Sequence, residues 1–196
     1  MTVLEDRTEM ADADANTQGL DELFERLERM PVPEGFRVEI VGGYIFMAPQ
    51  RDSHWGITFR IASAVAKRFG MDRVFSDVRI DFPGDKNGFC PDVALLKESA
   101  KKDDKGHWRY QDVEFVAEVI SQGTASNDYG PKRLAYAEAE VPLYVIADPC
   151  QGRCFVYTDP KDGDYGTRTA VDFGTGLDLT GTVVDLVLPT DGFPRD

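Results

Sequence analysis

Residues 114–121 read EFVAEVIS, and this short stretch decides the fold. Its apolar side chains form a nearly continuous run, which is typical of a strand that is covered on both faces of its sheet. Glu118 lies in the middle of this run. Because an ionised carboxylate is costly to bury alone, Glu118 should have a cation, a set of hydrogen-bond donors or a metal ion beside it, or lie at the exposed end of its strand.

Helix and strand patterns flank this stretch on both sides. Apolar residues at helical spacing predict a helix over 20–30 and a longer one over 53–69, with Asp52 or Ser53 as the N-cap of the second. Further strands are expected over 74–82, 91–96, 141–148, 153–159, 167–173 and 182–188, and an exposed loop over 99–112.

The order of these elements defines the class of fold. A helix, a β-hairpin formed by residues 36–48 around a Gly-Gly pair, a second helix, several strands, a third helix and more strands follow one another. This order predicts an α/β (α+β) fold, a mixed sheet flanked by helices rather than a regular βαβ repeat. Residues 1–18 are acidic and show no apolar periodicity, so we expect a disordered tail there and a single domain over 19–196.

The composition limits the functions that this chain can have. With 196 residues, of which 42% are hydrophobic, it can form a substantial core. It has neither a run of about 20 apolar residues nor the basic and apolar parts of a signal peptide, so we expect a cytoplasmic protein. The net charge of −13 argues against a surface that binds nucleic acid through unspecific phosphate contacts. A nucleic-acid function would therefore need a local basic patch or bridging metal ions.

Two acidic residues belong to successive apolar strands. Asp92 opens the strand over 91–96, and Glu118 lies in the strand that follows the polar loop. If these strands are neighbours in the sheet, the two carboxylates converge at one edge, where their repulsion raises a pKa or requires a cation between them. Mg²⁺ takes one or two carboxylates in this way, together with water and phosphate oxygens. The alternative is that Asp92 caps a turn and Glu118 forms an ordinary ion pair.

A lysine follows the strand of Glu118. Pro131 is tolerated in the first turn of a helix, so the third helix should begin near Asp128, as its N-cap, and run to about residue 140. Lys132 then lies at the start of this helix, close to the end of the strand, where it could reach the carboxylates. The alternative is a solvated lysine that pairs with Asp128 at i, i+4.

Several motifs in order resemble a known family. They are PDVALL (91–96), FVAEVIS (115–121), the D-x-x-x-K-x-x-x-Y pattern of Asp128, Lys132 and Tyr136, and VPLYVIADP (141–149). Together they resemble the Uma-type family of restriction endonucleases within the PD-(D/E)XK nuclease-like superfamily. The hairpin sequence FRVEIVGGYIFMAP (36–49), followed by His54, is similar to the opening of that family.

The resemblance implies a restriction-endonuclease-like fold with a site for Mg²⁺ or Mn²⁺. It implies that Asp92 corresponds to the Asp of the PD pair and Glu118 to the first acidic residue of the (D/E)XK half, both as metal ligands. The usual lysine of the superfamily would fall at Ile120, which cannot serve, and Lys132 on the following helix is the candidate in its place.

The resemblance also brings two further residues to the site. Glu39 would be an additional acidic residue, and His54 would be a neighbour of the site. The alternative for His54 is a capping or hydrogen-bonding role at the start of its helix.

The function expected from these residues is metal-assisted hydrolysis of phosphodiester bonds in nucleic acid, with DNA as the expected substrate. One alternative is a catalytically inactive binding or assembly protein on the same fold, which the acidic composition favours. Another is a carboxylate-pair hydrolase that acts on a different substrate, such as a glycoside. No membrane partner is expected, and an exposed edge strand together with the apolar hairpin is compatible with a homodimer.

Other polar and aromatic residues allow two interpretations. Residues 107–110, HWRY, could contact nucleic acid or fold onto the surface. Asp77 could support the site or belong to a solvated face. Trp55 and Phe59, at helical spacing, are expected in the core or in an interface.

Overall fold

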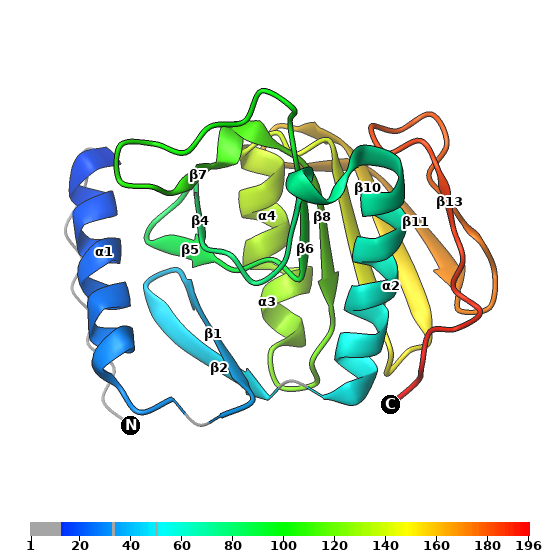
Figure 1. The fold of residues 1–196 in the computed structure, drawn as a ribbon, viewed down its shortest axis with the longest axis horizontal. Coiled ribbons are helices and arrows are strands. Elements are labelled where there is room, and N and C mark those ends of the chain that lie inside the picture. The colour runs from blue at the N-terminus through cyan, green and yellow to red at the C-terminus, as the bar shows by residue number, and fades with distance from the viewer. Residues whose placement is uncertain (1–12, 33, 50) are drawn as a thin grey trace.

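The computed structural model of the protein describes residues 13–32, 34–49 and 51–196, with side chains from residue 19 onward in these ranges (Figure 1). None of the helices in these ranges is long and apolar enough to cross a membrane. The α-helices are α1 (Ala13–Arg29), α2 (Asp52–Phe69), α3 (Ala125–Tyr129) and α4 (Pro131–Glu138), and short 3-10 helices occupy Met71–Arg73 and Tyr110–Asp112.

The strands form two main sheets and one small pair. Their bounds are β1 (Phe36–Val41), β2 (Tyr44–Pro49), β3 (Val74–Phe75), β4 (Ile80–Phe82), β5 (Asn87–Phe89), β6 (Val93–Leu96), β7 (Trp108–Arg109), β8 (Val113–Val119), β9 (Leu143–Asp148), β10 (Arg153–Lys161), β11 (Asp164–Asp172), β12 (Leu177–Asp178) and β13 (Val187–Leu188). The first sheet has the order β2-β1-β5-β4-β7, the second has β11-β10-β9-β8-β6-β3, and β12 pairs with β13.

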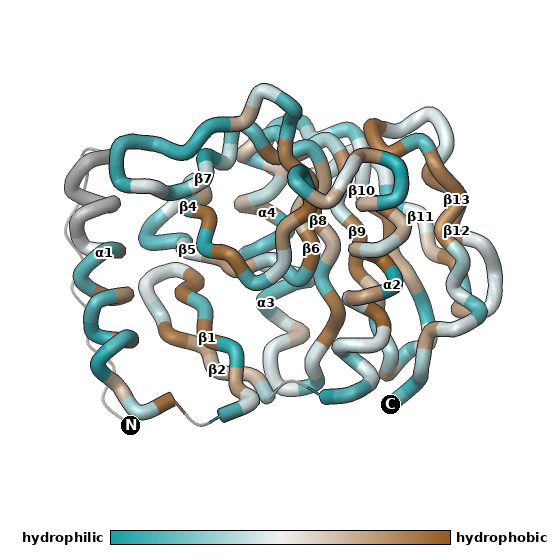
Figure 2. Tube along the Cα trace, in the orientation of Figure 1, coloured by the Kyte–Doolittle hydropathy of each residue, from teal (hydrophilic) through white to brown (hydrophobic). Residues whose placement is uncertain are grey.

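The second sheet carries the centre of the core. Strands β8 and β9 are parallel, whereas β6 and β10 run antiparallel to their neighbours, so the predicted mixed sheet is confirmed. Hydrophobic residues follow β6, β8 and β9 through the middle of the molecule in Figure 2. The EFVAEVIS strand is buried along almost its whole length, as its apolar run predicts.

Successive side chains of β8 enter two different cores. Phe115, Ala117 and Val119 pack with Ile57 and Ile61 of α2 on one face of the sheet. Val116 packs on the other face, where α4 contributes Tyr136 to the core. Because side chains alternate along a strand, Glu118 is directed to the face of Val116, toward α3 and α4. This alternation decides which charged residues Glu118 can meet.

The N-terminal helix and hairpin form the other side of the molecule. The hairpin is confirmed, with Gly42 and Gly43 at φ values of 57° and 76° in its turn. Helix α1 packs over this sheet, and a Cβ atom at Gly88 of β5 would lie 2.4 Å from the ring of Phe24, so a glycine is needed for this close approach. Helix α1 begins at Ala13, inside the segment 1–18 that we expected to be a tail, and residues 1–12 lie outside the described ranges.

Three local predictions are wrong. The expected strand 74–82 is split into β3 and β4, which belong to different sheets, and Asp77 between them has a left-handed φ of 56°. The N-cap of α2 is Arg51, without a side-chain cap hydrogen bond, rather than Asp52 or Ser53. The third helix is two helices, and Asp128 lies inside α3 rather than at an N-cap.

The C-terminal strands and the polar loop also differ from expectation. β10 and β11 continue the main sheet, but residues 182–188 contribute only β13 to the separate pair with β12. The loop over 99–112 contains β7, whose Trp108 packs against Phe75 with ring centroids 4.8 Å apart. Trp108 of the HWRY segment therefore folds onto the protein.

Candidate active site

The charged residues that sequence analysis assigns to a site lie close together between the two sheets. β1 contributes Glu39, the start of α2 contributes His54, and the start of α4 contributes Lys132. Asp92 directly precedes β6, and Glu118 lies near the end of β8. All of these residues are buried, although they come from distant parts of the chain.

Asp92 and Glu118 are neighbours because β6 and β8 pair in the sheet. Val93 lies opposite Ala117 in the antiparallel register. The backbone N–H of Asp92 donates to Glu118 Oε2 at 3.3 Å, and the N–H of Val119 donates to Asp92 Oδ2 at 2.7 Å. The structure therefore brings together the two carboxylates that the sequence predicts to converge.

Lys132 is fully buried and ion-paired to several carboxylates. Its Nζ lies 2.7 Å from Glu118 Oε1, 2.9 Å from Glu39 Oε2 and 2.9 Å from Asp128 Oδ1. The interpretation of Lys132 as a solvated residue is wrong, although its expected pairing with Asp128 is present. The contact to Glu39 is a hydrogen bond, and the other two are close ion pairs, so the ammonium group is surrounded by carboxylates.

Tyr136 lies one turn after Lys132 and contacts the same carboxylate. Its hydroxyl donates to Glu118 Oε1 at 2.6 Å, and its ring is fully buried. Burial and the charge of Glu118 hold the pKa of Tyr136 well above its usual value. The tyrosine of the D-x-x-x-K-x-x-x-Y pattern is therefore a hydrogen-bond donor to Glu118.

Arg37 is a further member of the site that sequence reasoning missed. Its Nη1 contacts Asp92 Oδ1, its Nη2 lies 3.9 Å from Glu118 Oε2, and its side chain is 9% exposed. A signal for it exists, because Arg37 and Glu39 are two residues apart on one strand and therefore point to the same face.

His54 approaches the same carboxylate from α2. Its Nε2 lies 3.2 Å from Asp92 Oδ1, which places the imidazole in the site rather than at a helix cap. A narrow opening next to His54 is lined in part by Ser121 and Asp196. His54 therefore lies between the buried carboxylates and the surface.

The carboxylates of the site outnumber its permanent cations. Glu39, Asp92, Glu118 and Asp128 face only Arg37 and Lys132. Burial raises the pKa of Glu118 to about 8, with Asp128 and Asp92 adding to the effect and Lys132 opposing it. Burial likewise raises the pKa of Asp128 against the influence of Lys132. The cluster therefore has more carboxylates than its own cations neutralise, and a proton or a bound cation has to supply the difference.

The pKa of Asp92 is shifted in the opposite direction. Burial disfavours its ionised form, but the charge of Arg37 and the hydrogen bond from His54 prevail and hold the pKa of Asp92 well below its usual value. Burial disfavours the charged form of Lys132 as well. The carboxylates of Asp128, Glu118 and Glu39 outweigh this effect and hold the pKa of Lys132 well above its usual value. Asp92 is thus ionised and Lys132 is protonated near neutral pH.

This donor set fits a divalent metal ion. Mg²⁺ and Mn²⁺ favour oxygen ligands, and one or two carboxylates suffice when water or phosphate completes the shell. Asp92 and Glu118 offer such oxygens side by side, and a bound cation could replace the proton that the excess of carboxylates over cations retains. The guanidinium of Arg37 already contacts both carboxylates, so a metal ion would compete with Arg37 for Asp92.

A second group of potential ligands lies outside this site. Asp21, Asp81 and His107 place one ligand atom each within 4.8 Å of one another, the only such trio in the part of the chain that the structure describes. Arg79 lies 2.7 Å from a carboxylate oxygen of each aspartate, and Lys105 lies 2.8 Å from Asp21. Because these cations already pair with the carboxylates, we assign no metal to this group.

The fold and the site together define the class of this protein. A mixed sheet flanked by helices, with a carboxylate pair and a buried lysine at one edge, describes a restriction-endonuclease-like fold. Residues 22–191 match the model of the Uma2 family, described as "Putative restriction endonuclease", and the chain belongs to this family.

A solved structure shares this fold. It is the crystal structure of "a putative nuclease belonging to DUF820" from Anabaena variabilis ATCC 29413, which matches with a TM-score of 0.66 and 18% sequence identity over 89% of this chain and 96% of that chain. No curated protein matches this chain.

Proposed function

We propose that this protein is a divalent-metal-dependent endonuclease that hydrolyses phosphodiester bonds in nucleic acid, with DNA as the expected substrate. The observation that carries the proposal is the adjacent placement of Asp92 and Glu118 in a buried cluster that has more carboxylates than permanent cations. Membership of a family of restriction endonucleases supports it.

Asp92 and Glu118 would hold Mg²⁺ or Mn²⁺. A bound ion of this kind lowers the pKa of a ligated water and neutralises charge on the phosphate. The lowered pKa of Asp92 keeps this ligand ionised at neutral pH. Glu118 has to lose its proton before it can serve as a ligand, since its pKa is raised to about 8.

Lys132 acts through Glu118 in this proposal. Because its ammonium group is fully buried and paired with carboxylates, it positions Glu118 and Glu39 rather than reaching the substrate itself. Tyr136 fixes the same carboxylate oxygen from the next turn of the helix. The two residues together determine which oxygen of Glu118 remains available for a cation.

His54 would position Asp92 at the opening of the site. With Asp92 ionised, the Nε2 atom that faces its carboxylate carries the proton and donates the hydrogen bond. The imidazole thereby orients Asp92, and His54 also lines the narrow opening.

A catalytically inactive binding or assembly protein is the second candidate. The contacts of Arg37 and Lys132 favour it, because they give both carboxylates cationic partners without a metal ion. The net charge of −13 favours it as well.

Calorimetric titration of Mn²⁺ into the metal-free protein tests the proposal. We expect saturable binding that is lost in Glu118→Gln and retained in Glu114→Gln, a control on the same strand whose carboxylate pairs with Arg73 at 2.6 Å outside the cluster. Circular dichroism of both variants verifies that they fold. Saturable binding would then lead to a cleavage assay on supercoiled and single-stranded DNA with Mg²⁺ or Mn²⁺.

Each outcome separates the candidates. Binding that survives in Glu118→Gln would rule out the proposed metal site. No binding by the parent, with or without an oligonucleotide present, would favour the inactive binding protein. Hydrolysis that persists in a chelator would point instead to a carboxylate-pair hydrolase.

A further inference from the structure

The outer face of α2 carries two aromatic side chains that the core does not use. Trp55 is 60% exposed and Phe59 is 57% exposed, and their ring centroids lie 5.8 Å apart at an interplanar angle of 39°. The opposite face of the helix supplies the buried residues Ile57 and Ile61. The interpretation of Trp55 and Phe59 as core residues is therefore wrong, and their exposure calls for a partner.

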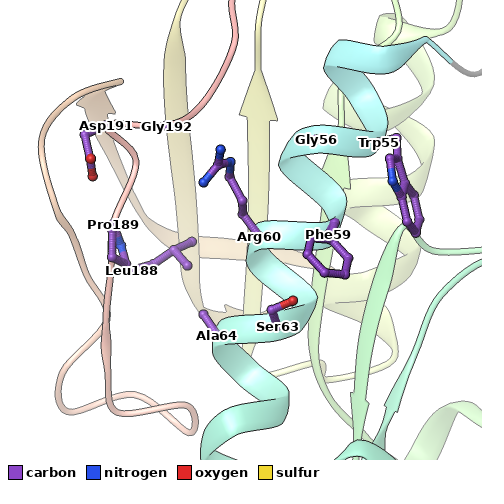
Figure 3. A pocket seen from close by; sticks show the side chains of 10 residues that line it. All are labelled: Trp55, Gly56, Phe59, Arg60, Ser63, Ala64, Leu188, Pro189, Asp191 and Gly192. Atoms are coloured by element: carbon purple, nitrogen blue, oxygen red, sulfur yellow. The ribbon is translucent and has the colours of Figure 1, made fainter.

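A pocket adjoins this aromatic pair. It has a volume of about 520 Å³ and lies between α2 and the segment 188–192, which begins at the last residue of β13 (Figure 3). Trp55 and Phe59 point to one side of the helix in Figure 3, and Arg60 points to the other side, toward this segment. A Cβ atom at Gly192 would lie 2.7 Å from Arg60 Cζ, so the glycine leaves room for the guanidinium.

Helix α2 is also basic, in contrast to the protein as a whole. Within the helix, Arg60, Lys67 and Arg68 face a single acidic residue, Asp52, whereas the chain carries a net charge of −13. Among the described residues, Arg60 and Lys67 form no ion pair, while Arg68 pairs with the exposed Asp185 at 2.8 Å. Lys67 and Arg68 lie in the last turn of the helix, so Arg60 is the cation of α2 that lies next to the aromatic pair and could contact a phosphate.

The aromatic pair continues directly from the proposed active site. His54 lies in the first turn of α2 and contacts Asp92 at 3.2 Å, and Trp55 is the next residue on the outer side of the same turn. A nucleic-acid strand with its scissile phosphate at Asp92 would therefore have its neighbouring nucleotides within reach of Trp55.

We propose that Trp55, Phe59 and Arg60 form a stacking face that binds unpaired bases next to the scissile phosphate. This inference rests on the proposed nuclease function and specifies its substrate as nucleic acid that is single-stranded, or locally unpaired, at the cleavage point. Aromatic side chains stack on bases of any sequence, and arginine adds a contact to the base or the phosphate. Bases within a duplex are already stacked on each other and present only their edges.

The charges of this face argue against two other occupants. A hydrophobic protein partner would have to bury Arg60 and Asp191, which both line this pocket and form no ion pair with each other, and burying such charges is costly. A second copy of this chain, packed symmetrically through the same face, would bring equal charges of the two basic helices together. Nucleic acid instead supplies a phosphate for Arg60, which forms no ion pair among the described residues.

Fluorescence quenching tests the inference without any cleavage step. The sequence has two tryptophans, so in a Trp108→Phe background the emission reports on Trp55 alone. We expect a single-stranded oligodeoxynucleotide of about 12 nucleotides, with EDTA present, to quench this emission saturably. In an anisotropy assay, Trp55→Ala and Phe59→Ala should each bind the labelled strand roughly tenfold more weakly than the parent.

Two comparisons make the test specific. Met71→Ala is the matched control, since Met71 is 76% exposed just beyond the end of α2, and it should bind the strand as well as the parent. A duplex of the same sequence should bind more weakly than the single strand. Equal affinity for both, or an equal loss in Met71→Ala and Trp55→Ala, would overturn the stacking face.

The remaining outcomes separate this inference from the proposed function. A parent that binds Mn²⁺ at Glu118 but neither quenches nor binds the strand would overturn the stacking face and leave the metal site intact. Quenching without any Mn²⁺ binding would support the stacking face and refute the metal-dependent reaction. A dimer that Trp55→Ala dissociates, without quenching by the strand, would identify a second copy of the chain as the occupant and overturn the inference.

Discussion

Replacing Lys132 by Met should reveal how strongly the buried ammonium holds the site together. Lys132 is fully buried, and its Nζ lies within 2.9 Å of an oxygen of Glu39, Glu118 and Asp128. Methionine retains the apolar stem of the side chain but removes the charge. The variant therefore leaves these carboxylates buried with only Arg37 as a nearby permanent cation.

The expected loss of stability is large and depends on pH. Removal of one partner of a buried ion pair costs about 3–5 kcal/mol, because the other partner stays buried and unpaired. Without the ammonium, the folded-state pKa values of Glu118 and its neighbours rise further, while their unfolded-state values stay the same. A carboxyl group with a raised folded-state pKa loses its stabilising contribution as the pH rises through that value. The cost of Lys132→Met should therefore be greatest near pH 8 and smaller near pH 5.5.

Urea unfolding monitored by circular dichroism at both pH values measures this cost, provided that parent and variant have equal m-values. The matched control is Arg133→Met, because Arg133 is the next residue of α4 and pairs with the half-exposed Asp164. We expect the control to cost about 0–1 kcal/mol. A Lys132→Met variant that is no less stable than the control at pH 8, or that is destabilised more at the lower pH, would refute the reasoning.

Three further substitutions have defined outcomes. Arg37→Gln should bind Mn²⁺ roughly ten- to a hundredfold more tightly in calorimetry, because no charge-assisted bond to Asp92 of about 1.5–3 kcal/mol has to break, and an unchanged or lower affinity would contradict the competition. Tyr136→Phe should lower the free energy of unfolding in urea by about 1.5–3 kcal/mol through the lost hydrogen bond to Glu118, and a neutral result would show that this bond adds no net stability. Gly88→Ala should cost about 1–3 kcal/mol in a thermal or urea melt, since the new methyl group collides with the first helix, and full stability would mean that the helix does not pack as described.

The centre of the fold could be predicted from the sequence because local rules decide it. The apolar run around Glu118 predicts a strand covered on both faces, and the strand is buried as expected. Pro131 predicts the start of a helix close to this strand, and Pro131 is the first residue of α4. These features depend on neighbours in the chain, which the sequence displays directly.

Arg37 and Asp128 could not be assigned in the same way, because their partners are set by tertiary packing. Arg37 meets the carboxylate of Asp92, 55 residues away and directly before a strand of the other sheet. Asp128 has the composition of an N-cap, but burial beside Lys132 gives it an ion-paired position inside α3. The division of the expected strand 74–82 at Asp77 could not be predicted either. Alternation along this segment defines two faces but does not say which sheet each half of the segment joins.

The placement of the site between the two sheets has a consequence for the order of folding. The ion pair of Lys132 with Glu39 closes a loop of 93 residues, and that of Arg37 with Asp92 closes one of 55, whereas β9, β10 and β11 pair with their neighbours in the chain. Long loops close at a greater entropic cost and more slowly than short ones. We therefore expect the β9–β11 meander and the β1–β2 hairpin to form early on refolding, and the hairpin to dock against the main sheet late. A chain caught before this last step exposes carboxylates without their arginine and lysine, so its affinity for cations is the earliest functional property that incomplete folding would change.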